Sequence, residues 1–329
     1  MNVLFNSDGV LRRTSPPHSA VPQRFRLPVG YSDFILFSGA GYLVVGLAVF
    51  AVWLGTGNDR WVVDFFRYPA ALVSIAFASI QLWFSQTAAR KFSPEQPMAT
   101  AWKLISFSAA CDVVSAVSIQ VLADNSAWNP LARTSWWTAG GGSVIRDFGA
   151  IVGGPARYSL LAAGLGYALR AYKRAGLQPK WKHADRIVLA IMGFYLLVEV
   201  GQVTSALSIG SIPSPSTVLG WPTDPLHWLL LGQALLLYRS AQLMGGGWIG
   251  RCWKAFSIGV FLVAASDIAA WASTAGFLHW PWSALQWYLW LPAAGVFALA
   301  PAYQLEAIAY AGMAGNLPAQ PGQLRNVPG

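Results

Sequence analysis

Charged residues are scarce in this chain of 329 residues. Only 11% of the residues are charged, whereas 55% are hydrophobic and the mean hydropathy is positive. A soluble domain carries roughly 25% charged residues, so the soluble globular class is excluded. The composition instead predicts a protein whose surface faces lipid over most of its area.

Cysteine and histidine are also rare, which limits metal and haem chemistry. The two cysteines, Cys111 and Cys252, fall at different depths of the predicted helices, so neither a disulfide nor a thiolate metal site is expected. Of the four histidines, only His227 and His279 lie near the same predicted face, and both are expected to be solvated at the membrane interface. No metal ligand is therefore assigned, and a haem held by two histidines is not expected.

The sequence also lacks the motifs of common enzyme classes. It has no phosphate loop, dinucleotide fingerprint, HExxH-type ligand pair or nucleophile elbow, so no catalytic residue is assigned and a protein without enzymatic activity is predicted. The net charge of +9 comes from basic residues that border apolar segments. This pattern favours anionic lipid headgroups as the partner and argues against nucleic acid.

Long apolar runs, in contrast, are abundant. About 20 apolar residues in a helix cross the roughly 30 Å of a hydrocarbon core. Eight segments of this kind predict eight transmembrane helices, at 33–55, 69–88, 103–122, 147–170, 186–208, 225–243, 255–275 and 283–305.

The basic residues predict the orientation of these helices. With the N-terminus in the cytoplasm, most of the 22 Lys and Arg fall in the tails and in the second, fourth and sixth connections. The other side keeps Arg60, Arg67, Arg133 and Arg146. An excess of basic residues marks the cytoplasmic side, so we expect a multi-pass protein of the cytoplasmic (inner) membrane with both termini inside.

Most of the 17 tryptophans lie near predicted helix ends. This is the pattern of an aromatic belt at the membrane–water interface, and it places Trp102 and Trp253 at the cytoplasmic interface. Two outer segments rich in Trp and Pro, 123–146 and 209–224, are expected either to lie on the membrane surface or to cover an outward-facing cavity.

Short patterns shared by the two halves indicate an internal duplication. The sequence "AACDVV" at 109–114 recurs as "AASDIA" at 264–269, and each follows a Trp-Lys pair. Each half has an even number of predicted crossings, so the two repeats would be parallel. The predicted fold class is an all-α integral membrane protein with two tandem, parallel four-helix units, 33–176 and 177–311, between a basic tail, 1–32, and a flexible tail, 312–329.

Four ionisable residues fall near the middle of predicted helices, namely Asp112, Arg157, Glu199 and Asp267. An ionised side chain at the bilayer centre costs roughly 2.5–3.5 kcal/mol on insertion scales, so such residues face protein or water and find partners. Arg157 can neutralise only one of the three acids. Gln202 follows Glu199 at i+3 on the same helix face and completes the set of candidate binding residues. The same residues are also compatible with pairs that only fix helix packing.

Two local signals concern the fourth predicted helix. The small residues of "GAIVG" at 149–153 predict close packing against a neighbouring helix. Pro155 follows, and because a proline inside a helix frees a backbone carbonyl, it permits a kink there.

Three strings give the chain a resemblance to a known group of proteins. "DPLHWLLLGQALLLYRSAQ" (224–242), "WKAFSIGVFLVAASDIAAW" (253–271) and "WKLISFSAACDVV" (102–114) resemble the multi-helix membrane sensor regions that precede diguanylate cyclase or histidine kinase domains in bacteria. Only a short polar tail follows the last predicted helix, with no room for an output domain. The resemblance therefore implies signalling through a separate partner protein.

Three functions are compatible with these observations. The first is a non-enzymatic sensor or ligand-binding module that signals to a partner. The second is an accessory subunit of a larger respiratory or photosynthetic membrane complex, and the third is a proton- or ion-coupled transporter of small solutes. No cofactor is predicted, although the apolar helices are compatible with contact with a quinone, a lipid or a pigment. The expected partners are membrane lipids and either other membrane subunits or a signalling protein.

Overall fold

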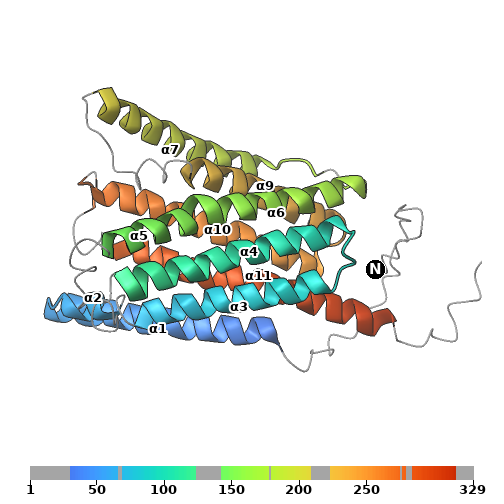
Figure 1. Cartoon of the computed structure of the whole chain (residues 1–329), viewed down its shortest axis with the longest axis horizontal. Helices are drawn as coiled ribbons and strands as arrows, with labels where there is room; N and C mark the ends of the chain where they lie inside the picture. Colours follow the sequence, from blue (N-terminus) through green and yellow to red (C-terminus); the bar gives the residue numbers. More distant parts are fainter. Residues whose placement is uncertain are drawn as a thin grey trace, which may run out of the picture.

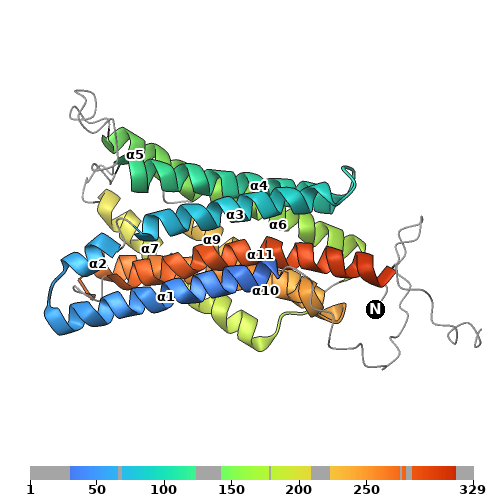
Figure 2. The same cartoon turned by 90° about the horizontal axis from the view of Figure 1, so that it is seen from below.

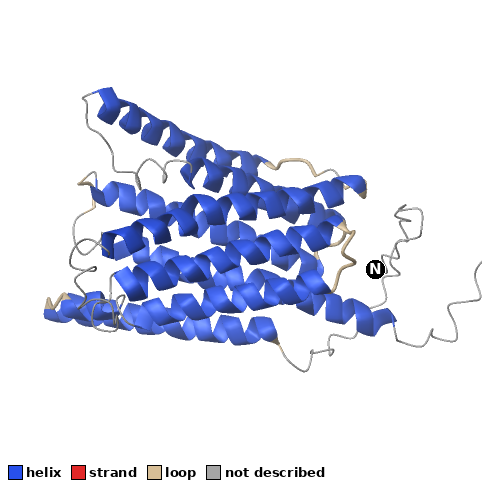
Figure 3. Ribbon diagram, in the orientation of Figure 1, coloured by secondary structure: helices blue, strands red, loops and turns tan. Residues whose placement is uncertain are grey.

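The computed structural model describes residues 30–65, 69–123, 142–177, 179–208, 223–274, 276–278 and 284–315. All regular secondary structure in these ranges is helical, as the composition predicts (Figure 3). Most of both predicted tails and of both Trp-rich outer segments lies outside the described residues, as does His279.

A helix covers most of each of the eight predicted segments. In chain order the elements are α1 (Tyr31–Thr56), α2 (Arg60–Phe65), α3 (Ala71–Arg90), α4 (Pro97–Ala116) with its π-helical extension η2 (Val117–Ala123), α5 (Gly142–Ile151), the π-helical segment η5 (Val152–Ala156), α6 (Arg157–Arg174), α7 (His183–Ser208), α9 (Thr223–Leu243), α10 (Gly247–Thr274) and α11 (Leu285–Gly315). Within the described ranges, five helices are long and apolar enough to cross a membrane, namely α1, α3, α4 with η2, α10 and α11. These five helices indicate a membrane protein, while eight crossings stay a prediction.

Six helices form a closed ring. In order around it, α3 packs against α4, α4 against α6, α6 against α9, α9 against α10, α10 against α11, and α11 against α3. Outside the ring, α1 packs against α11, and α7 packs against α9 (Figures 1 and 2). The main hydrophobic core therefore lies inside the ring, where the six helices meet.

Several helix connections lie at one end of the bundle. The start of α1 and the end of α11 lie at the same end as the turns that follow α3, α6 and α9 (Figure 1). The turn after α6 closes at Gly176, whose φ of 77° is accessible to glycine at little cost, and Leu177 donates its N–H to the carbonyl of Tyr172 at 3.0 Å. Basic residues such as Arg90, Lys91 and Arg174 border these turns. We call this the basic end of the bundle.

Two tryptophans expected at the membrane interface lie in the core instead. Trp102 on α4 and Trp253 on α10 are both fully buried, and their rings stack with centroids 6.0 Å apart. Phe256 and Phe297 continue this aromatic cluster toward α11. The interface prediction is wrong for these two residues, because both side chains point into the ring, where apolar area is removed from solvent and lipid alike.

The close helix packing predicted from "GAIVG" is confirmed. A Cβ atom on Gly149 would lie 2.7 Å from Cγ1 of Ile119, and one on Gly153 would collide with Ser115. The helix of Gly149 and Gly153 can therefore approach α4 and η2 this closely only because both residues lack a side chain.

Apolar side chains cover the outward face of α7. Ile187, Ile191, Phe194, Leu197 and Val200 recur every three or four residues and are between 48% and 72% exposed. A stripe of this kind on a peripheral helix is unfavourable in water and fits contact with lipid tails or with another membrane protein.

A carboxylate on α11 holds the start of α1. Glu306 is buried and accepts hydrogen bonds from the backbone N–H of Ser32 at 2.9 Å and from its hydroxyl at 2.8 Å. A negative charge is favourable at a helix N-terminus, where backbone N–H groups lack partners. Glu306 therefore fixes α1 to the ring at the basic end.

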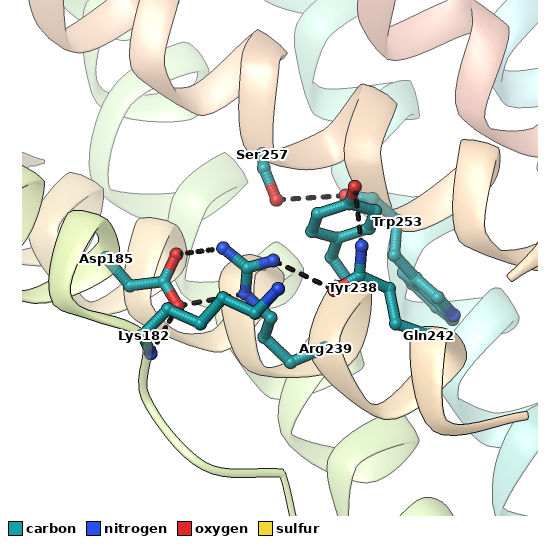
Figure 4. Close-up of polar contacts among 7 residues, drawn as sticks. All are labelled: Lys182, Asp185, Tyr238, Arg239, Gln242, Trp253 and Ser257. Carbon is teal, nitrogen blue, oxygen red and sulfur yellow. Dashed lines mark hydrogen bonds and ion pairs between the residues drawn. The ribbon is translucent and has the colours of Figure 1, made fainter.

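An ion pair holds α7 against α9 at the same end. Asp185 accepts hydrogen bonds from Nε of Arg239 at 2.9 Å and from its NH2 at 2.6 Å, and the backbone N–H of Lys182 adds a third at 3.0 Å (Figure 4). Arg239 also donates to Oε1 of Gln242 at 2.8 Å. Asp185 precedes the predicted span, and its hydrogen bonds from Arg239 lower the pKa of its carboxyl below the usual range.

Replacing Asp185 by asparagine is expected to lower the free energy of unfolding by about 1–3 kcal/mol at pH 7, because Arg239 loses a bidentate charged partner. A lowered pKa means that the unfolded chain binds more protons, so the contribution of Asp185 is fully present above about pH 4 and is lost as the pH falls through the lower native pKa. Unfolding of detergent-purified wild type and variant at pH 7 and pH 3 measures this. The exposed Glu95→Gln variant is the control. An Asp185→Asn deficit of the same size at both pH values would contradict the prediction.

Candidate functional site

Arg157 and Asp112 form an ion pair inside the ring. NH1 of Arg157, at the start of α6, lies 2.8 Å from Oδ1 of Asp112 on α4, and both residues are buried, at 5% and 7% exposed. Burial of two charges is costly, and only a close contact with good geometry compensates for the lost hydration. Each residue therefore depends on the other for its charged state.

His227 forms the second acid–base contact of the interior. It lies in the first turns of α9 and is 2% exposed. Its Nδ1 lies 2.9 Å from Oδ2 of Asp267 on α10 and 3.8 Å from Oδ1 of Asp224, one turn earlier on α9. Despite this proximity, neither ring nitrogen has a hydrogen-bond partner of acceptable geometry among the described residues.

Tyr158 joins the two acid–base contacts. Its ring meets the His227 ring edge to face, with centroids 4.2 Å apart, and the Arg157 guanidinium lies 5.0 Å from the centre of the same ring. Arg157 also lies 5.4 Å from the ring centre of Phe297 on α11. Aromatic faces attract cations, so these rings extend the polar contacts into one group of side chains. We call Asp112, Arg157, Tyr158, Asp224, His227 and Asp267 the buried cluster.

Two π-helical segments flank the residues of the first pair. Pro155 lies within η5, directly before Arg157, and because proline has no N–H, the regular i to i−4 ladder cannot continue through it. The η2 segment begins five residues after Asp112. Such wide turns inside helices are frequent at functional sites, and η5 ends at the residue before Arg157.

The structure unites three of the five sequence-predicted residues. Asp112, Arg157 and Asp267 all belong to the buried cluster. Glu199 and Gln202 lie on α7, but the placement of their side chains is outside what the structure describes. Whether those two residues contribute to the same site stays a prediction.

The expectation that His227 is solvated at the interface is wrong. α6 and α10 enclose it, so Asp267 has a basic neighbour that is not among the predicted site residues. A signal for this was present, because Asp224 and His227 are spaced i, i+3 and therefore share one face of α9. The opposing Asp267 could not be aligned with that face from the sequence alone.

The cluster lies toward the end of the bundle opposite the basic end. Asp224 is in the first turn of α9, and Asp267 precedes Thr274, the last residue of α10, by about two turns. The side chains of Asp224 and Asp267 are 20% and 36% exposed, so the cluster is accessible through its acids. Two surface grooves lie elsewhere, one between α7 and α9 near Trp181 and Trp228, the other between α3 and α4 near Arg90 and Lys103.

The charges of the cluster determine what it can hold. Arg157 and Asp112 neutralise each other, whereas Asp224 and Asp267 together face one histidine. The group formed by Asp224, Asp267 and His227 therefore carries net negative charge whether or not His227 is protonated, and it attracts cationic groups. Comparisons with known proteins add no assignment, since no family model, curated protein or solved structure matches this chain.

Proposed function

We propose that the protein is a non-enzymatic module of the cytoplasmic membrane that binds a small cationic ligand at the buried cluster and reports the binding to a separate partner protein. The observation that carries this proposal is the connected set of acid–base contacts across α4, α6, α9 and α10. A ligand bound there would contact several helices of the ring at once. It would favour whichever arrangement of those helices binds it more tightly.

The proposal includes eight membrane crossings with both termini in the cytoplasm. The basic residues around the turns after α3, α6 and α9 support this orientation. With that orientation the cluster lies in the outer half of the membrane and its accessible acids lie nearer the outer surface. The signal would pass along the ring to the basic end, where a cytoplasmic partner can bind.

The proposal also includes the internal duplication. The recurrence of "AACDVV" as "AASDIA" supports it, and the ring is compatible with it, because exchanging α3, α4 and α6 with α9, α10 and α11 leaves every neighbouring pair of the ring a neighbouring pair. Asp112 on α4 then corresponds to Asp267 on α10. The bases do not correspond, since Arg157 is on α6 and His227 is on α9. In each half, the corresponding acid would thus have its own basic partner, Arg157 for Asp112 and His227 for Asp267.

Ligand-induced stabilisation of the purified protein tests the proposed function. We expect at least one member of a panel of inorganic cations and organic amines to raise the unfolding temperature of wild type. Asp267→Asn should lose the shift, because it removes one of the accessible acids. Asp185→Asn, which alters an acid at the opposite end, should keep it. An unchanged unfolding temperature of wild type with every cation, or an equal rise in Asp267→Asn, would contradict the proposal. Glu199→Gln in the same assay tests whether α7 contributes to cation binding.

A second candidate function is an accessory subunit of a larger membrane complex. The exposed apolar stripe on α7 favours this alternative, because a neighbouring subunit could cover it as well as lipid does. Purification from its native membrane in mild detergent discriminates the two. A large assembly, coloured or containing a quinone, supports the subunit, whereas a monomer with a cation response supports the ligand-binding module.

A further inference from the structure

The contact between α9 and α10 carries the ligand set of a metal site. One oxygen each of Asp224 and Asp267 and one nitrogen of His227 lie within 4.8 Å of one another. The shortest of these distances, 2.9 Å between Nδ1 of His227 and Oδ2 of Asp267, is in the range that two ligands of one metal ion adopt when each lies about 2.0–2.2 Å from it. Small movements of the Asp224 side chain would bring its carboxylate within coordination distance of the same ion.

The burial of His227 without a hydrogen-bond partner among the described residues independently indicates a ligand at this contact. This side chain is 2% exposed, and neither nitrogen has a hydrogen-bond partner of acceptable geometry in the described part of the chain. Buried polar atoms are nearly always satisfied, so an unsatisfied imidazole aimed at two carboxylates is an unusual arrangement. Oδ2 of Asp267 is likewise buried without a hydrogen bond there. A shared cation would satisfy both atoms at once.

Charge balance selects the class of cation. With His227 neutral, as a metal ligand must be, the two aspartates carry two negative charges. A divalent cation brings this part of the cluster to neutrality, which a monovalent cation does not. The adjacent Arg157–Asp112 pair is already neutral and adds no net charge. One imidazole with two carboxylates is a donor set suited to a first-row transition metal ion such as Zn²⁺.

We propose that Asp224, His227 and Asp267 bind one divalent transition metal ion of the zinc class. This inference rests on the proposed function, because it names the cation that the buried cluster binds. Three protein ligands leave a further coordination position for water or a small molecule. The ion would join α9 to α10 inside the ring, so its arrival or departure changes the contact between two helices that carry no other ion pair linking them in the described residues.

Cobalt(II) binding to the full-length purified protein tests the metal site. Wild type, freed of metal by chelation, should bind one equivalent of Co²⁺ with visible d–d bands, and Zn²⁺ should displace it. His227→Asn and Asp267→Asn should each weaken binding by about 100-fold or more, since even residues behind the ligands contribute 10–100-fold. The matched control is His183→Asn, an exposed histidine at the start of α7, which should bind as wild type does.

The outcomes separate this inference from the proposed function. Absence of one-equivalent binding in wild type overturns the metal site regardless of how the variants fold. Unchanged affinity in a folded His227→Asn or Asp267→Asn protein, verified by circular dichroism, also overturns it. If an organic amine stabilises wild type through Asp267 while Co²⁺ and Zn²⁺ do not bind, the metal site is wrong and the ligand-binding module stands. If no cation of either kind has an effect, both are wrong.

Discussion

Replacing Arg157 by methionine is expected to lower the free energy of unfolding by about 3–5 kcal/mol, because it breaks a buried ion pair. The variant leaves the Asp112 carboxylate buried, 7% exposed, without its partner at 2.8 Å. It also removes the cation that lies 5.0 Å from the ring centre of Tyr158 and 5.4 Å from that of Phe297. Denaturation in mild detergent, followed by circular dichroism, measures the loss.

The double variant distinguishes a lost ion pair from lost packing. Arg157→Met combined with Asp112→Leu removes both charges, so most of the deficit should be recovered. Arg170→Gln is the control, because Arg170 lies on the same helix with an exposed side chain. It should change stability by less than about 0.5 kcal/mol. A double variant as unstable as Arg157→Met alone would contradict the importance of the pair.

Replacing Trp253 by alanine is expected to cost about 3–5 kcal/mol through a cavity at the centre of the ring. The indole of Trp253 contacts Trp102 from α4 and Phe256 on its own helix. The indole Nε1 donates a hydrogen bond to the hydroxyl of Tyr172 on α6 at 2.9 Å. Loss of the side chain therefore weakens contacts among three helices. The same unfolding assay in detergent measures this cost.

Two further variants make the Trp253 prediction specific. Tyr172→Phe removes only the hydrogen bond from Trp253 and should cost about 1 kcal/mol. Trp83→Ala removes a side chain of the same size that is 67% exposed on α3, and it should have little effect on unfolding. Equal effects of Trp83→Ala and Trp253→Ala would show that the aromatic cluster is not a core.

Helical class and the positions of the helices were predictable from the sequence because they depend on local properties. Twenty-residue apolar runs and the turn signals between them require no knowledge of neighbours. The same holds for Gly149 and Gly153, whose spacing alone indicated a close approach. Asp112, Arg157 and Asp267 were predictable as a set because ionisable residues deep in apolar helices need partners.

The pairing of these residues was not predictable, because it depends on how helices are rotated about their axes. His227 lies three residues after Asp224 near the start of α9, a position that fits a solvated interface equally well. Only the packing of α6 and α10 around it makes it a buried base. The same reason explains Trp102 and Trp253, since a tryptophan near a helix end can face the membrane surface or the core.

We expect the Arg157–Asp112 pair and the His227–Asp267 contact to be coupled through Tyr158, so that they act as one cluster and not as two separate packing contacts. A double-mutant cycle with Asp112→Asn and Asp267→Asn measures this coupling most directly as a free energy of unfolding in detergent. One cluster predicts an interaction energy of about 0.5–3 kcal/mol, whereas a parallel cycle of Asp112→Asn with Asp185→Asn should be additive. Additivity within about 0.3 kcal/mol for Asp112 and Asp267 would contradict the claim and leave two independent contacts that fix helix packing.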